Sequence, residues 1–184
     1  MRAEATDVYE VEVKVPADHD AVRDALAAAG AEEGATVEQA DTYYDAPHRD
    51  FASTDEALRV RRVRTGDTED ARLTYKGPKV DTRSKTREEI ETGVEDADDA
   101  GAILEALGFS PAATVRKRRT YFAVGEYAVV LDDVAGLGEY VEVEREVPAA
   151  DVDDARDAAY ELLETLGLDP ADQIRTSYLG LLLE

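Results

Sequence analysis

The sequence predicts an α+β protein in which eight antiparallel strands close into a barrel or tunnel and helices pack on the outside. Three observations favour this fold. Several strand-like segments alternate charged and apolar residues, so that one face of each segment carries the charges. The order strand, helix and three strands occurs twice along the chain. The helical segments are amphipathic and mostly end at a glycine, which is typical of helices that cover one face of a sheet.

The first half of the chain begins with a strand over Tyr9–Val15. Its valines alternate with three charged residues, Glu10, Glu12 and Lys14. A helix is predicted over Asp18–Ala29, because apolar residues recur there at helical spacing before Gly30. Three strands follow, separated by turns that contain glycine: Thr36–Tyr44, Ala57–Thr65 and Ala71–Lys76.

The second half repeats this order. A strand over Arg87–Val94 leads into a helix over Asp98–Leu107. Three strands are predicted next, over Thr114–Val124, Tyr127–Val134 and Glu139–Val147. Two helices close the chain, over Asp151–Leu166 and Ala171–Leu183. Since no linker or low-complexity tract interrupts the pattern, we expect one domain that spans residues 1–184.

The charged strand faces decide between a flat sheet and a closed one. Residues two apart share a face on several strands: Arg59 with Arg61, Thr74 with Lys76, Arg87 with Glu89 and Glu91, Lys117 with Arg119, and Glu142 with Glu144. A solvated face would be mostly acidic in this chain, whereas these faces carry basic and acidic groups in similar numbers. Confined charges need ligands and counter-ions. We therefore predict a tunnel with a basic wall for a polyanion and an acidic wall for metal ions, and an apolar outer face beneath the helices.

The amino-acid composition limits the classes of protein and of site that this chain can form. With 184 residues, of which 43% are hydrophobic, the chain can bury a full core. It has no apolar run near the roughly 20 residues that span a bilayer, so no membrane partner is expected. The N-terminal segment lacks an apolar signal region, which favours a cytoplasmic location. The absence of cysteine excludes disulfides, thiolate metal sites and thiol nucleophiles.

The formal net charge of −22 arises from 43 acidic and 21 basic residues. An acidic, lysine-poor composition resembles that of proteins from salt-loving organisms, and an acidic mesophilic protein is the alternative. In a salt-loving organism the charge reflects the solvent and does not exclude an anionic ligand. The few basic residues then become informative, and 15 of the 21 fall between Arg49 and Arg119. The five lysines are Lys14, Lys76, Lys79, Lys85 and Lys117.

A set of motifs occurs in order along the chain. The first is E-V-E-V-K at Glu10–Lys14, and the others are D-T-Y-Y-D-A-P at Asp41–Pro47, A-L-R-V-R at Ala57–Arg61, L-T-Y-K-G-P at Leu73–Pro78, V-R-K-R-R-T-Y at Val115–Tyr121, L-D-D-V-A-G-L-G at Leu131–Gly138, Y-V-E-V-E at Tyr140–Glu144 and S-Y-L-G-L-L at Ser177–Leu182. This set resembles the CYTH family, whose triphosphate tunnel fold includes class IV adenylate cyclases, thiamine triphosphatases and inorganic triphosphatases, and the first motif matches the family's E-x-E-x-K signature. The last motif resembles the cyclase-type branch, and the acidic composition suggests a halophilic archaeon.

The resemblance implies roles for specific residues. Carboxylates that would bind Mg²⁺ or Mn²⁺ are Glu10, Glu12, Glu142 and Glu144, with Asp132 as a further metal ligand or a structural carboxylate. Side chains that would bind the triphosphate are Lys14, Arg59, Arg61, Lys76, Lys85, Arg87, Lys117 and Arg119. Of these, the resemblance favours a direct catalytic part for three lysines, Lys14, Lys76 and Lys85.

The implied activity is that of a class IV adenylate cyclase, which converts ATP to cyclic AMP and pyrophosphate. One alternative is a phosphohydrolase that cleaves tripolyphosphate, thiamine triphosphate or a nucleoside triphosphate. Another is a protein that binds polyphosphate or a nucleotide without turnover. The expected partners are therefore ATP or another triphosphate, in a monomer or a homodimer, and no nucleic acid.

Two structural alternatives remain open for the basic residues. Arg59 and Arg61 could pair with Glu89 and Glu91 across the sheet instead of binding a ligand. The R-K-R-R run at Arg116–Arg119 could form a nucleic-acid patch, but it lacks interleaved aromatic residues and a basic helix. A strand sends alternate side chains to opposite faces, so we expect Arg116 and Arg118 to point outward and pair with surface acids.

Overall fold

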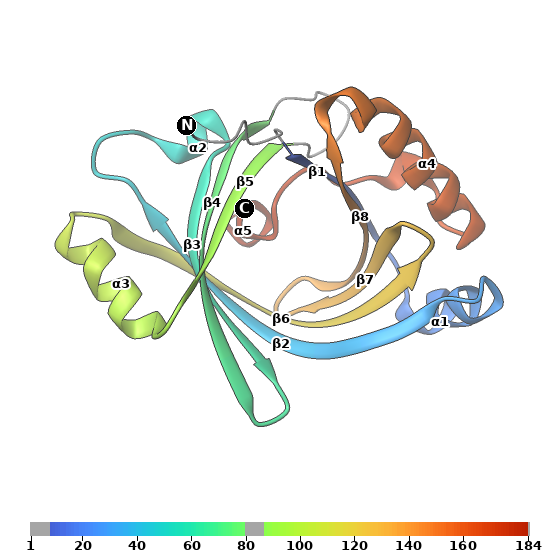
Figure 1. Ribbon diagram of the computed structural model, residues 1–184, viewed down its shortest axis with the longest axis horizontal. Coiled ribbons are helices and arrows are strands. Elements are labelled where there is room, and N and C mark those ends of the chain that lie inside the picture. Colours follow the sequence, from blue (N-terminus) through green and yellow to red (C-terminus); the bar gives the residue numbers. More distant parts are fainter. Residues whose placement is uncertain (1–7, 80–86, 184) are drawn as a thin grey trace, which may run out of the picture.

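The computed structural model describes residues 8–79 and 87–183. Eight antiparallel strands close into a barrel in the order β1-β5-β4-β3-β2-β6-β7-β8, with most helices on its outside and the C-terminal helix at its interior (Figure 1). The predicted fold class is therefore confirmed. No helix in the described part of the chain is long and apolar enough to cross a membrane.

The strands follow the predicted ones closely. Their bounds are Val8–Pro16 for β1, Glu32–Asp45 for β2, Ala57–Thr65 for β3, Thr68–Lys79 for β4, Arg87–Val94 for β5, Ser110–Val124 for β6, Tyr127–Val134 for β7 and Gly138–Pro148 for β8. Strands β2 and β6 are longer than predicted because they pair with each other nearly from end to end, from Glu32 opposite Ala123 to Asp45 opposite Ser110. Such pairing lets polar end residues join a strand that local pattern alone does not extend.

The helices are α1 at His19–Ala28, α2 at Phe51–Thr54, α3 at Ala97–Ala106, α4 at Val152–Thr165 and α5 at Tyr178–Leu183. Aspartate side chains accept hydrogen bonds from the first backbone amides of α1, α2 and α3, as expected of N-caps. The short α2 was not predicted, since one helical turn carries no periodicity. Gly30 and Gly167, with φ angles of +73° and +78°, follow the ends of α1 and α4 and adopt the left-handed conformation that suits glycine.

The prediction of one helix over Ala171–Leu183 is wrong. A 3₁₀ turn at Pro170–Asp172 is followed by an irregular stretch, and α5 begins only at Tyr178. The irregular stretch bonds to β1, where the Ile174 amide donates to the Lys14 carbonyl at 2.8 Å. Ser177 then caps the N-terminus of α5, because its Oγ accepts a hydrogen bond from the Gly180 amide at 3.0 Å. Tertiary contacts thus override the apolar pattern here.

The main apolar core lies between the barrel and the helices that cover it. Val13 and Val15 of β1 and Val143 of β8 are fully buried against Leu26 of α1 and Leu163 of α4. A smaller core lies under α3, where Tyr44, Val60 and Leu104 meet. The apolar face of β1 therefore packs beneath the helices as predicted, and the charged face of the same strand is turned into the barrel.

Candidate active site

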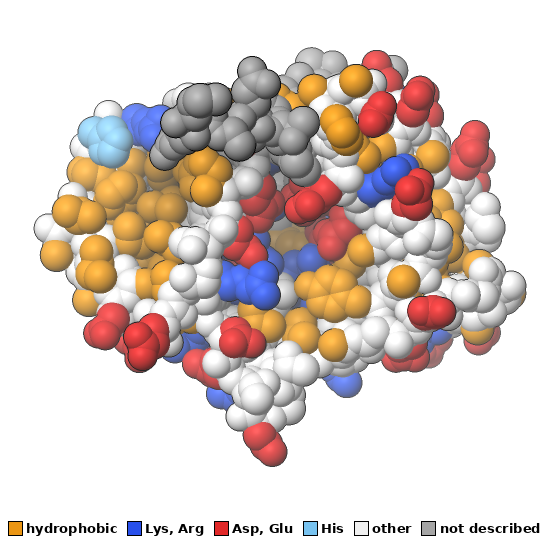
Figure 2. Space-filling model, viewed as in Figure 1, with side chains coloured by type: hydrophobic (Ala, Val, Ile, Leu, Met, Phe, Trp, Pro, Cys, Tyr) orange, Lys and Arg blue, Asp and Glu red, His pale blue; other side chains and the backbone are white. Residues whose placement is uncertain are grey.

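The interior of the barrel forms a cavity of about 2100 Å³, and acidic and basic side chains gather around its opening in Figure 2. Strand faces and the C-terminal residues 173–180 supply most of its lining. Two sets of predicted residues line it. The acidic group consists of Glu10, Glu12, Glu142 and Glu144, and the basic group of Arg59, Arg61, Lys76, Arg87, Lys117 and Arg119.

Two other predicted site residues lie outside this lining, and a third is not among the described residues. Lys14 is 1% exposed and its Nζ donates a hydrogen bond to the Thr176 backbone carbonyl at 2.8 Å. Asp132 is 0% exposed and lies behind the basic group. Lys85 lies outside the described residues.

The acidic group lies on two neighbouring strands. Glu12 of β1 is directly opposite Glu144 of β8, and Glu142 is opposite Lys14. Burial, which outweighs the attraction of Arg119, raises the pKa of Glu144 to about 8, and the neighbouring glutamates, Glu10 among them, add to the rise. Glu144 therefore lies in a buried part of the cavity that contains several carboxyl groups.

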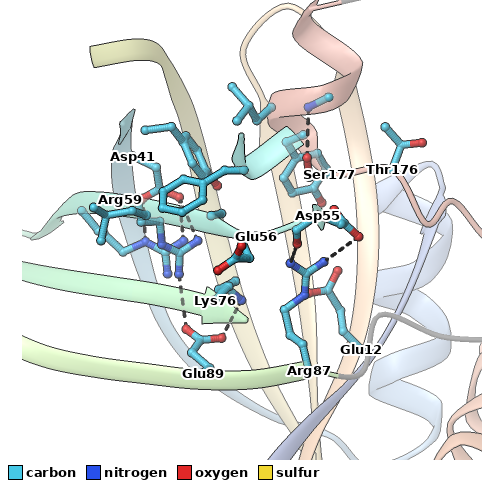
Figure 3. A pocket seen from close by; sticks show the side chains of 18 of the residues that line it. Glu12, Asp41, Asp55, Glu56, Arg59, Lys76, Arg87, Glu89, Thr176 and Ser177 are labelled. Carbon is cyan, nitrogen blue, oxygen red and sulfur yellow. Dashed lines mark hydrogen bonds and ion pairs between the residues drawn. The ribbon is translucent and has the colours of Figure 1, made fainter. Parts of the chain in front are cut away.

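Glu10 is in a different electrostatic setting. Burial by itself would raise its pKa, but the Lys76 ammonium, whose Nζ lies 3.0 Å from Glu10 Oε2, helps to hold that pKa at about 2. Lys76 also lies 2.5 Å from Glu89 Oε2. Figure 3 shows Glu89 between the side chains of Lys76 and Arg59. Strand β4 thus brings a lysine into contact with both β1 and β5.

Arg59 and Arg61 of β3 share a buried carboxylate. Asp41, on the adjacent strand β2, accepts hydrogen bonds from Arg61 Nε at 2.6 Å and Nη2 at 2.7 Å, and from Arg59 Nη1 at 3.3 Å. Burial opposes ionisation, yet the two guanidinium groups hold the pKa of Asp41 well below its usual range. The alternative of pairing with β5 is correct only for Arg59, which lies 3.6 Å from Glu89.

Lys117 and Arg119 of β6 are organised in the same way around Asp132 of β7. Asp132 accepts hydrogen bonds from Lys117 Nζ at 3.0 Å and from Arg119 Nε at 2.7 Å. Arg119 also hydrogen-bonds Glu142 and lies 3.8 Å from Glu144, so it connects the basic group to the acidic one. Burial, followed by the charge of Arg119, lowers the pKa of Lys117.

Arg87, at the start of β5, is held differently from the rest of the basic group. Its Nη1 donates to the Asp55 backbone carbonyl at 2.7 Å, and its Nη2 lies 3.4 Å from the Asp55 carboxylate (Figure 3). Asp55 ends α2 with a φ of 57°, in the left-handed region. The loop that contains α2 therefore closes over this end of the cavity and fixes Arg87.

The family model for the CYTH domain matches residues 8–178. The chain belongs to the CYTH family. It is 39% identical to the putative adenylate cyclase MJ0240 of Methanocaldococcus jannaschii, over 78% of this chain and 80% of that one. It is 30% identical to the adenylate cyclase CyaB of Aeromonas hydrophila, over 92% and 86%. The solved structure of the PH1819 protein from Pyrococcus horikoshii OT3 is 38% identical and superimposes with a TM-score of 0.89, over 95% and 98%.

CYTH proteins generally use a divalent metal ion, and the chemistry of the acidic group fits one. Four carboxylates supply the hard oxygen ligands that Mg²⁺ and Mn²⁺ prefer. A cation among them would also offset the charge that contributes to the raised pKa of Glu144. Within residues 8–79 and 87–183, no three acidic or histidine side chains are already close enough to hold a metal ion. Side-chain rotation would therefore have to accompany binding.

Sequence reasoning missed the role of Asp41, a buried carboxylate that supports the basic group of this CYTH chain, but it did name Asp132 as a metal ligand or a structural carboxylate. Asp41 lies in one of the quoted motifs, but nothing in that motif reveals its pairing with β3. Tyr178 was also quoted without a role, although it lines the cavity and donates to Asp132. The expectation that Arg116 and Arg118 point outward holds, since both are exposed on β6. The expected ion pairs of these two arginines do not form with any described residue.

Proposed function

We propose that the chain is a metal-dependent adenylate cyclase of class IV, which converts ATP to cyclic AMP and pyrophosphate. The observation that supports this proposal most strongly is that the acidic and basic groups line the same cavity. Binding a triphosphate needs fixed positive charge for the phosphate oxygens, and binding its metal ion needs carboxylates close by. The adenylate cyclase names of two relatives support the choice of reaction.

The basic group would hold the triphosphate. Arg61 and Arg119 each present a guanidinium that is already oriented by a buried aspartate, which lowers the entropy lost when phosphate binds. Lys76 would supply a compact charge between the two groups. The charges of these side chains would also stabilise the negative charge that develops on the leaving pyrophosphate.

The acidic group would hold Mg²⁺ or Mn²⁺ through Glu10, Glu12, Glu142 and Glu144. When bound, such an ion supplies charge neutralisation for the phosphates and acidifies the attacking 3′-hydroxyl. Asp132 serves better as a support, because Lys117, Arg119 and Tyr178 already donate to its two oxygens. We assign it no part in metal binding.

In the proposed reaction the 3′-hydroxyl oxygen of ATP attacks the α phosphorus. The bond from this oxygen to phosphorus forms as the bond to the bridging oxygen of pyrophosphate breaks, with the two oxygens in line, and the proton of the 3′-hydroxyl passes to solvent water. A triphosphatase would use the same basic group but let water attack the terminal phosphorus. The position of the triphosphate along the cavity decides between these reactions.

Product analysis tests this proposal. Purified protein is incubated in molar KCl with ATP or with tripolyphosphate, with Mg²⁺ or Mn²⁺, and Glu12→Gln serves as the inactive control. Cyclic AMP and pyrophosphate in equal amounts are the expected products. Orthophosphate released from either substrate would instead identify a triphosphatase. Binding of both compounds without any product would identify a binding protein.

A further inference from the structure

Tyr178, in the C-terminal helix, contacts several charged side chains of the barrel interior. It is the first residue of α5, is 7% exposed and lines the cavity. Its ring packs against that of Tyr140 of β8, with 5.2 Å between centroids, in a cluster with Val115 and Val134. The C-terminal segment thus brings an aromatic side chain into the barrel wall.

The hydroxyl group of Tyr178 completes the set of donors around Asp132. It donates to Asp132 Oδ2 at 3.1 Å, the oxygen that also accepts from Lys117 Nζ at 3.0 Å and Arg119 Nη2 at 2.5 Å. Burial and the nearby carboxylates raise the pKa of Tyr178 above its usual value, so the hydroxyl keeps the proton that it donates. A buried carboxylate with three donors has a fixed orientation, and it fixes the two basic side chains in turn.

The ring of Tyr178 lies next to two ammonium groups. Lys14 Nζ is 3.9 Å from the ring centroid and Lys117 Nζ is 5.1 Å from it. These lysines come from β1 and β6, and the π face attracts both. Two residues before Tyr178, the Thr176 carbonyl accepts the hydrogen bond from Lys14 Nζ. The C-terminal segment therefore holds Lys14 through two neighbouring contacts.

We propose that Tyr178 is a positioning residue that sets the charges of Lys117 and Arg119 for the triphosphate and fixes Lys14 beside them. This inference rests on the proposed function, because it names a residue that prepares the same site. The ring locates the two lysines, and the hydroxyl locates the guanidinium of Arg119 through Asp132. Tyr178 itself is assigned no contact with the reacting atoms.

The test compares Tyr178→Phe and Tyr178→Leu with Phe122→Leu as the control. Phe122 is a buried aromatic residue, 6% exposed, that packs in the main core and does not line the cavity. Its truncation therefore removes comparable packing without disturbing the charges. Affinity for tripolyphosphate is measured by calorimetry in EDTA, where binding depends on the basic residues alone and no turnover intervenes. Melting temperatures are recorded alongside.

We expect Tyr178→Phe to bind tripolyphosphate roughly tenfold more weakly, since it loses only a hydrogen bond to a charged group. Tyr178→Leu should lose more, because the ring contact with the lysines is also gone. Phe122→Leu should melt at a lower temperature but bind within about threefold of the wild type. In turnover assays KM should rise more than kcat falls.

Two results would overturn the inference in different ways. If the wild type binds tripolyphosphate and the three variants lose the same affinity, Tyr178 acts through packing alone and the proposed function stands. If the wild type does not bind tripolyphosphate in EDTA or with Mn²⁺, the proposed function fails and the inference fails with it.

Discussion

The basic and acidic groups of the cavity differ in how the protein itself balances them. Arg61 and Arg119 each meet a buried aspartate in paired hydrogen bonds shorter than 3 Å. In the acidic group Glu10 pairs with Lys76 and Glu142 with Arg119, whereas Glu144 lies 3.8 Å from Arg119, with other glutamates around it. The protein therefore supplies counter-ions for its anion site and for part of the acidic group, and we expect a metal ion to offset the charge around Glu144.

The largest expected effect comes from the acidic group. Replacement of Glu10 or Glu12 by glutamine should reduce turnover at least about 100-fold, because the loss of metal-binding charge removes several kcal/mol of transition-state stabilisation. Initial rates with ATP and Mn²⁺ provide the measurement, and circular dichroism checks the fold. Glu38→Gln, at an exposed position of β2, is the control and should keep full activity. Rates within tenfold of the wild type for both variants would remove the metal assignment.

The buried carboxylate that pairs with the basic group should contribute to the free energy of unfolding. Asp132→Asn leaves Lys117 and Arg119 without their shared carboxylate, and breaking a buried ion pair in this way costs about 3 kcal/mol of unfolding free energy. Chemical denaturation in molar KCl measures it. The neighbouring Asp133→Asn is the control, since Asp133 is exposed and points outward. Equal stability of the two variants would mean that the protein does not rely on this carboxylate.

Strand parity separates the basic group from the outer arginines. Lys117→Ala and Arg119→Ala should each weaken tripolyphosphate binding roughly tenfold or more, as expected from the loss of one charge-assisted contact. Arg116→Ala and Arg118→Ala should bind within about twofold of the wild type, because their side chains lie on the outer face. Calorimetric titration of the four variants measures this. A similar loss of affinity in all four variants would indicate that Arg116–Arg119 act together as a surface patch.

The structure clarifies which features a single sequence can reveal. The bounds of β3, β5 and β7 match the prediction, because turn residues and strict alternation mark them locally. The inward direction of the charged faces also follows from alternation. The contact between Tyr178 and Asp132 joins residues 46 apart because the C-terminal segment packs against the barrel wall, which no local pattern encodes. The predicted pairing of Arg116 and Arg118 does not occur with any described acid, since an exposed arginine is not forced to meet a nearby carboxylate.

The smallest expected effect is the pH dependence of thermal stability that arises from the Glu144 carboxyl group. The pKa of Glu144 is about 8 in the folded protein against 4.5 for a free glutamate, so the folded state holds a proton that the unfolded chain releases. The resulting stability is fully present below pH 4.5 and is lost as the pH rises toward 8. In EDTA, the wild type should therefore melt lower at pH 9 than at pH 6, and Glu144→Gln should show a weaker dependence. An identical pH dependence in the two proteins would contradict this assignment.

We propose that the acidic group binds a metal ion beside a triphosphate held by the basic group. Crystals grown with Mn²⁺ and tripolyphosphate test this directly, because anomalous scattering at the manganese edge locates the ion. We expect a manganese peak in coordination contact with Glu10, Glu12 and a glutamate of β8, and phosphate oxygens within hydrogen-bond distance of Arg61 and Arg119. A cavity without manganese, or a triphosphate bound only to the outer arginines, would contradict it.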